Sequence, residues 1–166
     1  MNQKIHLRAL EPSDLELLYK WENDERIWHS SSHTRPLSKQ TLKWYIDSVN
    51  DIFTDKQLRL IIMHNQTPVG CIDLFDFDPL HQRACLGIMI DHQQEGQGYA
   101  KMAILEVKKY AFSQLGLHQL HANIAQNNQK SISLFTGTGF THTSTKKEWL
   151  RFNKTWVDEL FFQCFN

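Results

Sequence analysis

The chain has 166 residues, the size of one domain, so we expect a single domain over residues 1–166. Lys and Arg number 18 against 18 Asp and Glu, which gives a net charge of zero. This balance excludes the surplus of positive charge that binds nucleic acid, but it is compatible with a local patch that holds a small ion.

The first third of the chain predicts one strand and two helices. Residues 4–9 alternate apolar and polar side chains, which is typical of a strand. Ser13 and Glu16 form a capping-box pattern that places a helix over residues 13–23, and the polar residues 23–36 predict a loop. Helical spacing predicts a second helix after Ser38, with an apolar face of Leu42, Tyr45, Ile46 and Val49.

The middle of the chain predicts a hairpin and a central strand. Residues 58–64 and 69–75 are strand-like and flank a turn. After a second turn, residues 83–91 are almost wholly apolar, as in a central strand. Gly87 within this strand predicts a bulge or the close approach of another group.

The last part of the chain predicts a strand, a short helix and a hairpin. Residues 118–124 form the strand, and Asn128 is placed to cap the helix. Residues 140–150 and 155–165 flank a polar turn, so they predict an antiparallel hairpin that closes the chain.

The cysteines and histidines give no sign of a disulfide or a metal site. Cys71, Cys85 and Cys164 are odd in number and lie among apolar neighbours, which indicates buried thiols in a reducing cytoplasm. His118 and His121 are three apart on a predicted strand, so they face opposite sides and share no metal. Neither a signal peptide nor an apolar run of about 18 residues is present, so we expect no secretion and no membrane span.

A glycine loop lies between the central strand and a long helix predicted from Tyr99 to Leu115. Gly96 and Gly98 in this loop let backbone N–H groups and the helix N-terminus hold an anion. An ordinary turn is the alternative interpretation. The pattern matches neither the dinucleotide fingerprint nor the P-loop, because the later glycine and the Gly-Lys-Ser/Thr run are missing.

Several segments resemble, in chain order, the GNAT superfamily of acetyl-CoA-dependent N-acyltransferases. They are Glu95-Gly96-Gln97-Gly98-Tyr99-Ala100 before the long helix, then Asn128-Gln129-Lys130-Ser131, then Gly139-Phe140. Residues 6–10 with Asp14, residues 81–84 and Glu148-Trp149-Leu150 are similar to a subgroup with RimJ/RimL-type N-terminal acetyltransferases and bacterial spermidine acetyltransferases. The resemblance implies an α/β (α+β) GNAT fold: a mixed, mostly antiparallel central sheet of about seven strands, helices on both faces, and a splay at the acetyl-CoA site.

The resemblance also implies which residues bind acetyl-CoA. The family's phosphate-loop pattern aligns with Glu95, Gly98 and Ala100, and a second register that begins at Gln93 would shift the apolar helix face by two residues. Glu95 departs from the usual Arg or Gln, so its carboxylate is expected to face solvent or a cation. The central strand is expected to supply an N–H to the acetyl carbonyl. The implied binding residues are Ile88, Met89, Ile90, Glu95, Gly96, Gln97, Gly98, Tyr99, Ala100, Asn128 and Ser131.

For the reaction, the resemblance implies direct attack by an amine on the acetyl thioester. Phe135 stands where many family members carry the Tyr that protonates the leaving thiolate. Ser131 is the substitute that the RimL-like pattern offers, and Glu148 is the candidate base, with Trp149 expected to shield it from water. The alternative interpretations are an ordinary first-turn serine and a solvated carboxylate paired with a neighbouring lysine.

The expected acceptor is a primary amine: a protein or peptide α-amine, a polyamine or another small amine. At pH 7 the free energy needed to deprotonate an α-amine is about 1 kcal/mol, whereas a lysine-like amine needs about 5 kcal/mol. A polyamine would need an acidic pocket, for which Glu22, Asp24 and Glu25 are candidates. The departures at Glu95 and Phe135 leave open a non-catalytic acetyl-CoA-binding module or sensor. A homodimer is also open, and no nucleic acid, membrane or metal partner is expected.

Overall fold

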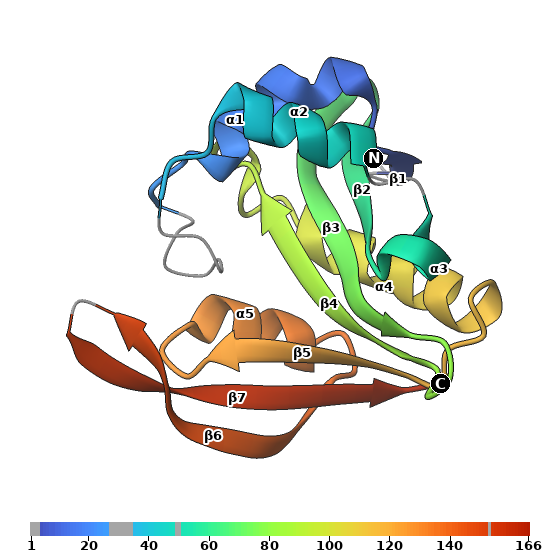
Figure 1. Cartoon of the computed structure of the whole chain (residues 1–166). Helices are drawn as coiled ribbons and strands as arrows, with labels where there is room; N and C mark the ends of the chain where they lie inside the picture. The colour runs from blue at the N-terminus through green and yellow to red at the C-terminus, as the bar shows by residue number, and fades with distance from the viewer. Residues whose placement is uncertain (1–3, 27–34, 49–50, 153) are drawn as a thin grey trace.

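A computed structural model describes residues 4–26, 35–48, 51–152 and 154–166. In these ranges the chain forms one seven-stranded sheet with helices on both faces (Figure 1). The strand order is β1-β2-β3-β4-β5-β7-β6. The elements are β1 (Ile5–Ala9), α1 (Leu15–Glu22), α2 (Lys39–Ser48), α3 (Ile52–Asp55), β2 (Leu58–His64), β3 (Thr67–Asp78), β4 (Arg83–Ile90), α4 (Tyr99–Ser113), β5 (Gln119–Ala125), α5 (Gln129–Thr136), β6 (Thr141–Phe152) and β7 (Thr155–Phe165), with 3-10 turns at Pro12–Asp14 and His92–Gln94.

The predicted strands and longer helices are confirmed, while two local details differ. The predicted capping box of Ser13 and Glu16 is wrong, because the Glu11 N–H donates to Asp14 Oδ2 at 2.9 Å instead. The short helix α3 was not predicted; the Asp51 side chain caps it by accepting from the Thr54 N–H. Val49, assigned to the second helix by its spacing, lies outside the described residues.

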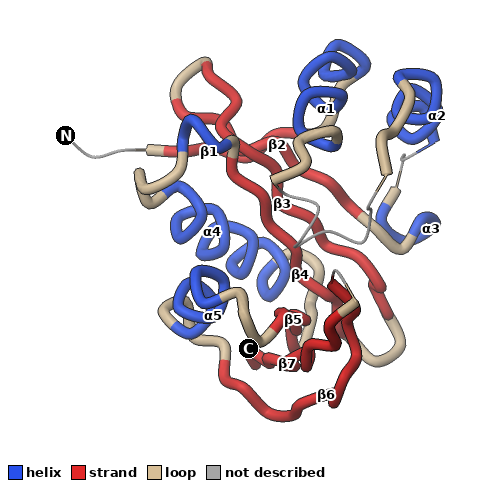
Figure 2. The backbone as a smooth tube through the Cα atoms, turned by 90° about the vertical axis from the view of Figure 1, so that its left-hand side faces the viewer, coloured by secondary structure: helices blue, strands red, loops and turns tan. Residues whose placement is uncertain are grey.

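Helices cover both faces of the sheet, and the hydrophobic core beneath one helical layer is larger than the core beneath the other. Figure 2 shows α4 and α5 on one side of the sheet and α1 and α2 on the other. Leu120, Ala122 and Ile124 of β5 point into the larger core beneath α4. The smaller core beneath α1 and α2 includes Leu18 and Trp21. We call the sheet face that bears α1 and α2 the open face, because the helices leave its β5–β7 end uncovered (Figure 2).

The sheet divides between β4 and β5, which are its parallel pair. Only three residue pairs join these strands, and the last is Cys85 with His121. Beyond this point, which we call the fork, the two strands diverge (Figure 1). The expected splay of the sheet is therefore confirmed.

Gly70 and Gly87 place backbone or side chains unusually close to the central strand. Gly87 is in regular register with Asp73, so the predicted bulge is wrong, and the close approach comes from the Phe75 ring. Gly70 lies on β3 opposite the end of β4, and a Cβ there would lie 2.2 Å from the Met89 carbonyl oxygen. Among the described residues no helix is long and apolar enough to cross a membrane.

Candidate active site

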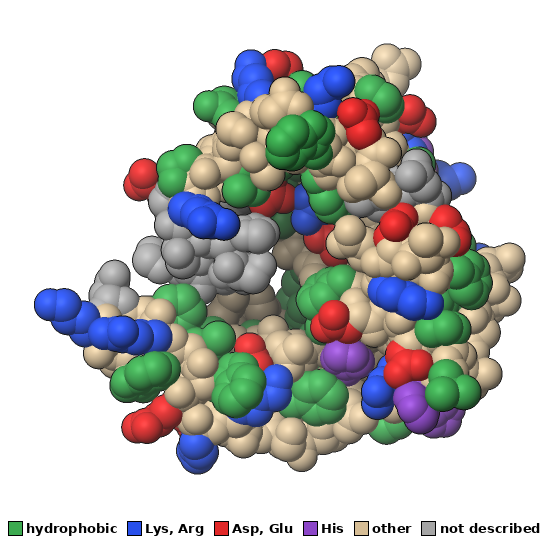
Figure 3. All heavy atoms as spheres, viewed as in Figure 1, with side chains coloured by type: hydrophobic (Ala, Val, Ile, Leu, Met, Phe, Trp, Pro, Cys, Tyr) green, Lys and Arg blue, Asp and Glu red, His purple; other side chains and the backbone are tan. Residues whose placement is uncertain are grey.

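A hollow opens on the open face between the half of the sheet that carries α1 and α2 and the half formed by β5, β6 and β7 (Figure 3). Under α1 and α2 the structure encloses a cavity of about 430 Å³. Its lining is rich in charge: among the described residues it contains Glu22, Asp55, Lys56, Arg59, Asp73 and Asp76.

Arg59 binds two of the carboxylates that line this cavity. Arg59 donates from Nε and Nη2 to the two oxygens of Asp73, at 2.7 and 2.8 Å, and from Nη1 to Glu22. Its guanidinium lies 5.3 Å from the centre of the Tyr45 ring. Burial opposes the charge of Arg59, but the charge of Asp73 outweighs it and raises the pKa of Arg59 well above its usual value. Burial raises the pKa of the Tyr45 hydroxyl to about 12.

Of the three acidic residues proposed for a polyamine pocket, one lines the cavity. Glu22 does so, whereas Asp24 pairs with Arg26 and Glu25 is exposed. Sequence reasoning missed Asp73 and Asp76. Asp73 and Asp76 are three residues apart, so a regular strand would place them on opposite faces. Both line the cavity where β3 is irregular: its register with β4 shifts after Phe75, and Asp76 has a φ of 49°, which the sequence pattern did not indicate.

The glycine loop adopts the conformation that the sequence predicts for an anion site. Gly96 and Gly98 have φ values of 78° and 79°, in the left-handed region that glycine adopts without strain. Gly98 is the N-cap of α4, whose first N–H groups have no acceptor within the helix. Apart from the adjacent residues, no heavy atom of the described part of the chain lies within 4 Å of where a Cβ on either glycine would stand. The loop therefore offers open space and the positive end of a helix, which fits a pyrophosphate.

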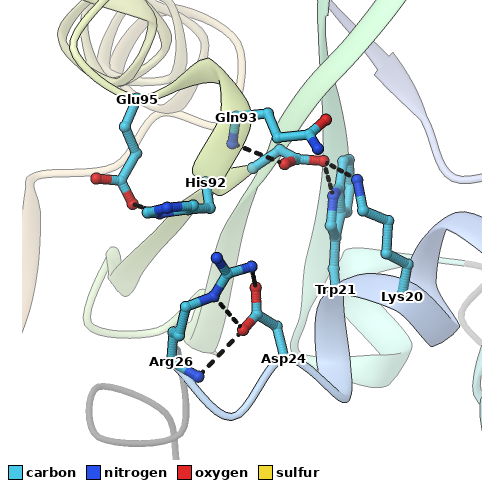
Figure 4. Close-up of polar contacts among 8 residues, drawn as sticks. Lys20, Trp21, Asp24, Arg26, His92, Gln93 and Glu95 are labelled. Carbon is cyan, nitrogen blue, oxygen red and sulfur yellow. Dashed lines mark hydrogen bonds and ion pairs between the residues drawn. The ribbon is translucent and has the colours of Figure 1, made fainter.

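Asp91 anchors this loop to the opposite layer of the molecule through Lys20 and Trp21 of α1, which Figure 4 shows beside Gln93. Its Oδ2 accepts from Lys20 Nζ at 2.6 Å and from Trp21 Nε1 at 2.9 Å, both on α1. Its Oδ1 accepts from the Gln93 N–H at 3.1 Å. Burial would raise the pKa of Asp91, but these donors outweigh it and lower the pKa below its usual value.

Glu95 faces the ammonium group of Lys130 and the imidazole ring of His92, and its place in the loop led us to expect solvent or a cation. Its carboxylate lies 2.9 Å from Lys130 Nζ on α5 and 3.6 Å from His92 Nδ1. Lys130 is the main cause that lowers the pKa of Glu95 below its usual value. The carboxylate is therefore ionised at pH 7, and Lys130 offsets its charge beside the loop.

Asn128 caps α5, as predicted, by accepting from the Ser131 N–H at 3.1 Å. This bond places the half-buried Ser131 in the first turn of the helix. Phe135, one turn further on, is buried and packs edge-on against Phe140 with ring centres 5.0 Å apart. The position of the usual Tyr thus belongs to the core and carries no polar group.

Glu148 lies in an irregular part of β6, where the pairing with β7 shifts between Lys146 and Leu150. Its φ is 49°, and its backbone N–H donates to Asp158 Oδ1 at 2.9 Å. The expected shielding by Trp149 is wrong, because that side chain is 61% exposed and its ring lies over Lys146. The neighbouring lysines also do not bind Glu148: Lys146 pairs with Glu159, and Lys147 with Asp158.

The structure thus combines a sheet that divides between β4 and β5, a glycine loop that leads from the end of β4 into α4, and a charged cavity on the open face. The chain belongs to the GNAT acetyltransferase family: residues 4–141 match the model of the acetyltransferase (GNAT) domain. It is an N-acetyltransferase, and the GNAT fold and the resemblance found in the sequence are confirmed.

Relatives and solved structures agree with this assignment. The spermidine N(1)-acetyltransferase of Vibrio cholerae serotype O1 is 26% identical over 144 residues, which are 84% of this chain and 80% of the relative. The putative ribosomal N-acetyltransferase YdaF of Bacillus subtilis is 23% identical, over 98% of this chain and 91% of its own. The crystal structure of the Vibrio cholerae spermidine N-acetyltransferase in complex with CoA and spermine has a TM-score of 0.88 at 24% identity, covering 97% of this chain and 95% of that one.

Proposed function

We propose that this protein transfers an acetyl group from acetyl-CoA to a primary amine of a small polycation, of the polyamine class. The charge of the cavity carries this proposal. Its described lining has four carboxylates, on Glu22, Asp55, Asp73 and Asp76, against the two cations Lys56 and Arg59, a formal charge of −2. Such a cavity attracts an acceptor with several ammonium groups more strongly than a peptide α-amine with one. Two relatives named as spermidine acetyltransferases support the same class.

The loop and the neighbouring strand are proposed to hold the coenzyme. The N–H groups from Gly96 to Ala100 bind its pyrophosphate, and Gln97 and Tyr99 contribute through their place in the loop. Ile88, Met89 and Ile90 lie beyond the fork, where β4 has lost its partner β5, so their backbone is free to meet the acetyl-bearing arm. Asn128 and Ser131 lie at the start of α5. Bound in this way, acetyl-CoA supplies an activated acyl group.

Glu148 is proposed to accept the proton that an incoming ammonium group must lose, and Ser131 to orient a water or relay a proton near the leaving thiol. The exposure of Glu148 suits the first role, because a solvated carboxylate exchanges protons freely with water. The first-turn position of Ser131 suits the second, because its N–H is fixed by Asn128 while its side chain is half-buried.

Glu148→Gln is expected to lower kcat by roughly 10- to 100-fold, at the low end of general-base effects because the carboxylate is exposed. The affinity for acetyl-CoA should not change, since the amide keeps the size of the side chain. Steady-state kinetics with a polyamine and calorimetry with acetyl-CoA measure the two quantities. Glu106→Gln, on an exposed position of α4, is the matched control. Unaltered kcat in Glu148→Gln would remove this residue from the mechanism.

Glu95→Gln is expected to tighten acetyl-CoA binding by a few-fold, and Lys130→Ala to weaken it by a similar factor. Both follow from the pair that the structure shows: the first change removes a negative charge beside the pyrophosphate loop, and the second uncovers it. The exposed pair is worth about 0 to 1 kcal/mol, which limits both effects. Calorimetry at low and high salt is the measurement, with Lys109→Ala at the other end of α4 as control. Opposite signs would show that Glu95 does not lie near the phosphates.

The function itself is tested by release of the coenzyme thiol from acetyl-CoA with matched amines. Spermidine, 1,4-diaminobutane, butylamine and a short peptide differ in the number and spacing of their charges. We expect kcat/KM to fall in that order and the difference between the diamine and the monoamine to shrink in high salt. Equal or faster transfer to the peptide would overturn the choice of acceptor. Binding of acetyl-CoA without transfer to any amine would instead indicate a non-catalytic module.

A further inference from the structure

The fork carries a histidine with one ring nitrogen, Nδ1, that finds no hydrogen-bond partner among the described residues. His121 on β5 pairs in register with Cys85 of β4 at the last joined position before the strands part. Its neighbours Leu120 and Ala122 point into the core beneath α4, so the His121 side chain lies on the open face. Asp73 and Phe75, which line the charged cavity, lie on this same face through their register with Gly87 and Cys85.

The His121 ring packs against an aromatic side chain, but one of its ring nitrogens lacks a hydrogen bond within the described residues. Its ring packs against Phe161 with centres 5.3 Å apart. Among buried side-chain nitrogen and oxygen atoms of the described residues, His121 Nδ1 is the one with no hydrogen-bond partner. Such a group costs about 1 to 3 kcal/mol if it stays unpaired, so a water or a substrate group is expected to bond it.

The surroundings favour a neutral ring. Burial is the main cause that lowers the pKa of His121 below its usual value; Asp76 of β3 opposes it, and Arg83 of β4 and Lys146 of β6 lower the pKa further. Cys85, its partner on β4, is uncharged, because burial raises the pKa of that thiol to about 12. On β7 the neighbours are the neutral Phe161 and Gln163. A neutral imidazole at pH 7 is ready to take up a proton.

We propose that His121 is a proton relay for acetyl transfer, an inference that rests on the proposed function. The neutral amine attacks the thioester carbon, so a C–N bond forms and the C–S bond breaks. His121 takes the proton that the attacking nitrogen loses and returns it to the leaving thiolate, directly or through a short chain of waters. One proton thus moves from nitrogen to sulfur, and no other reactant is needed. This assigns to His121 the step for which Phe135 offers no hydroxyl.

The relay and the proposed role of Glu148 concern different protons. An ammonium acceptor loses one proton before it attacks and a second one while the amide forms. On β7, Glu159 pairs with Ala125 of β5 on one side and with Lys146 of β6 on the other. Ala125 is four residues beyond His121 along β5, and Glu148 is two residues beyond Lys146 along β6. Strand residues rise about 3.3 Å each, so Glu148 lies more than about 10 Å further along the sheet. Ile88 follows Cys85 by three residues, which is about 10 Å along β4 from the fork, within reach of an imidazole and bridging waters.

The test compares His121→Gln with His118→Gln, an exposed histidine three residues away that stacks on Phe165. We expect His121→Gln to lower kcat by about 10²- to 10⁴-fold while acetyl-CoA affinity stays within about two-fold, and His118→Gln to change neither. In the wild type, kcat should fall as the pH drops through the ionisation of His121. This acid limb should be absent from His121→Gln, a result that a merely structural role would not produce.

If His121→Gln folds poorly, the variant Asp76→Asn tests the relay without changing the histidine. Asp76 has a φ of 49°, a left-handed conformation that Asn tolerates, so Asp76→Asn should preserve the fold. Loss of its negative charge should move the acid limb of kcat to lower pH. Independently of turnover, the His121 ring signals in NMR should titrate with a midpoint below 6.5.

The outcomes separate the two proposals. If His121→Gln transfers acetyl as fast as the wild type and with the same pH profile, the relay alone is overturned. An NMR midpoint of His121 above 7 would have the same consequence. No transfer by the wild type to any amine would overturn the proposed function and the relay together.

Discussion

Arg59→Ala is expected to lower the free energy of unfolding by about 2 to 3 kcal/mol. The change leaves Asp73 and Glu22 side by side without the cation that holds both. Breaking a fully buried ion pair costs roughly 3 to 5 kcal/mol. The three side chains here are 17%, 24% and 19% exposed, for Arg59, Asp73 and Glu22, so water screens part of the repulsion and the estimate is lower.

The measurement is the urea midpoint at constant m-value, which reports stability under two-state unfolding. Arg26→Ala is the matched control, because Arg26 also pairs with an aspartate but is 62% exposed, and we expect it to leave the midpoint nearly unchanged. Adding Asp73→Asn and Glu22→Gln to Arg59→Ala should recover part of the loss, since the two carboxylates that Arg59 bound then no longer repel each other. A midpoint for Arg59→Ala equal to that of Arg26→Ala would contradict the role of Arg59 as the organiser of the cavity.

Gly70→Ala is expected to destabilise the protein by about 2 to 3 kcal/mol and to weaken acetyl-CoA binding as well. The added Cβ would lie 2.2 Å from the Met89 carbonyl oxygen and 2.9 Å from the Ile90 Cα, and both are backbone atoms that cannot turn aside. Overpacking costs typically 1 to 3 kcal/mol, and rigid neighbours place this case at the upper end, at about 3. The strain falls on the part of β4 proposed to meet the coenzyme.

Gly87→Ala is the comparison on the adjacent strand. Its Cβ would meet the Phe75 ring edge at 3.2 Å, and a ring can shift by a few tenths of an ångström. We therefore expect a cost below about 1 kcal/mol. In thermal unfolding and in calorimetry with acetyl-CoA, Gly70→Ala should show a larger loss of stability and affinity than Gly87→Ala. Equal losses would mean that the backbone of β3 at Gly70 can move away from β4 to accommodate the added Cβ.

The local geometry of the proposed coenzyme half of the site was predictable, because it depends on residues that are neighbours in the chain. Gly96, Gly98 and the start of α4 lie within four residues of one another, and Asn128 caps the helix that begins at the next residue, Gln129. Each feature is a property of a few neighbouring residues, so composition and spacing indicate it directly.

The acceptor half was not predictable in the same way. The cavity joins Glu22 of α1 to Arg59 of β2 and Asp73 of β3, and those contacts exist only after the sheet register is fixed. His121 was considered only as a metal ligand, because nothing in the sequence indicates that β4 and β5 part directly after it. Helix α3 was missed for a different reason: four residues are too few to show a helical period.

The unequal cores imply that the two walls of the site open at different free energies. Among the described residues, 22 are buried in the cluster beneath α4 and 7 in the cluster beneath α1 and α2. Local opening costs less where fewer apolar contacts are lost. Amide protons of α1 and α2 should therefore exchange with solvent faster than those of α4. The wall proposed to meet the coenzyme is then the part that opens least often, and the wall proposed to meet the amine is the part that can adjust its shape to one acceptor or another.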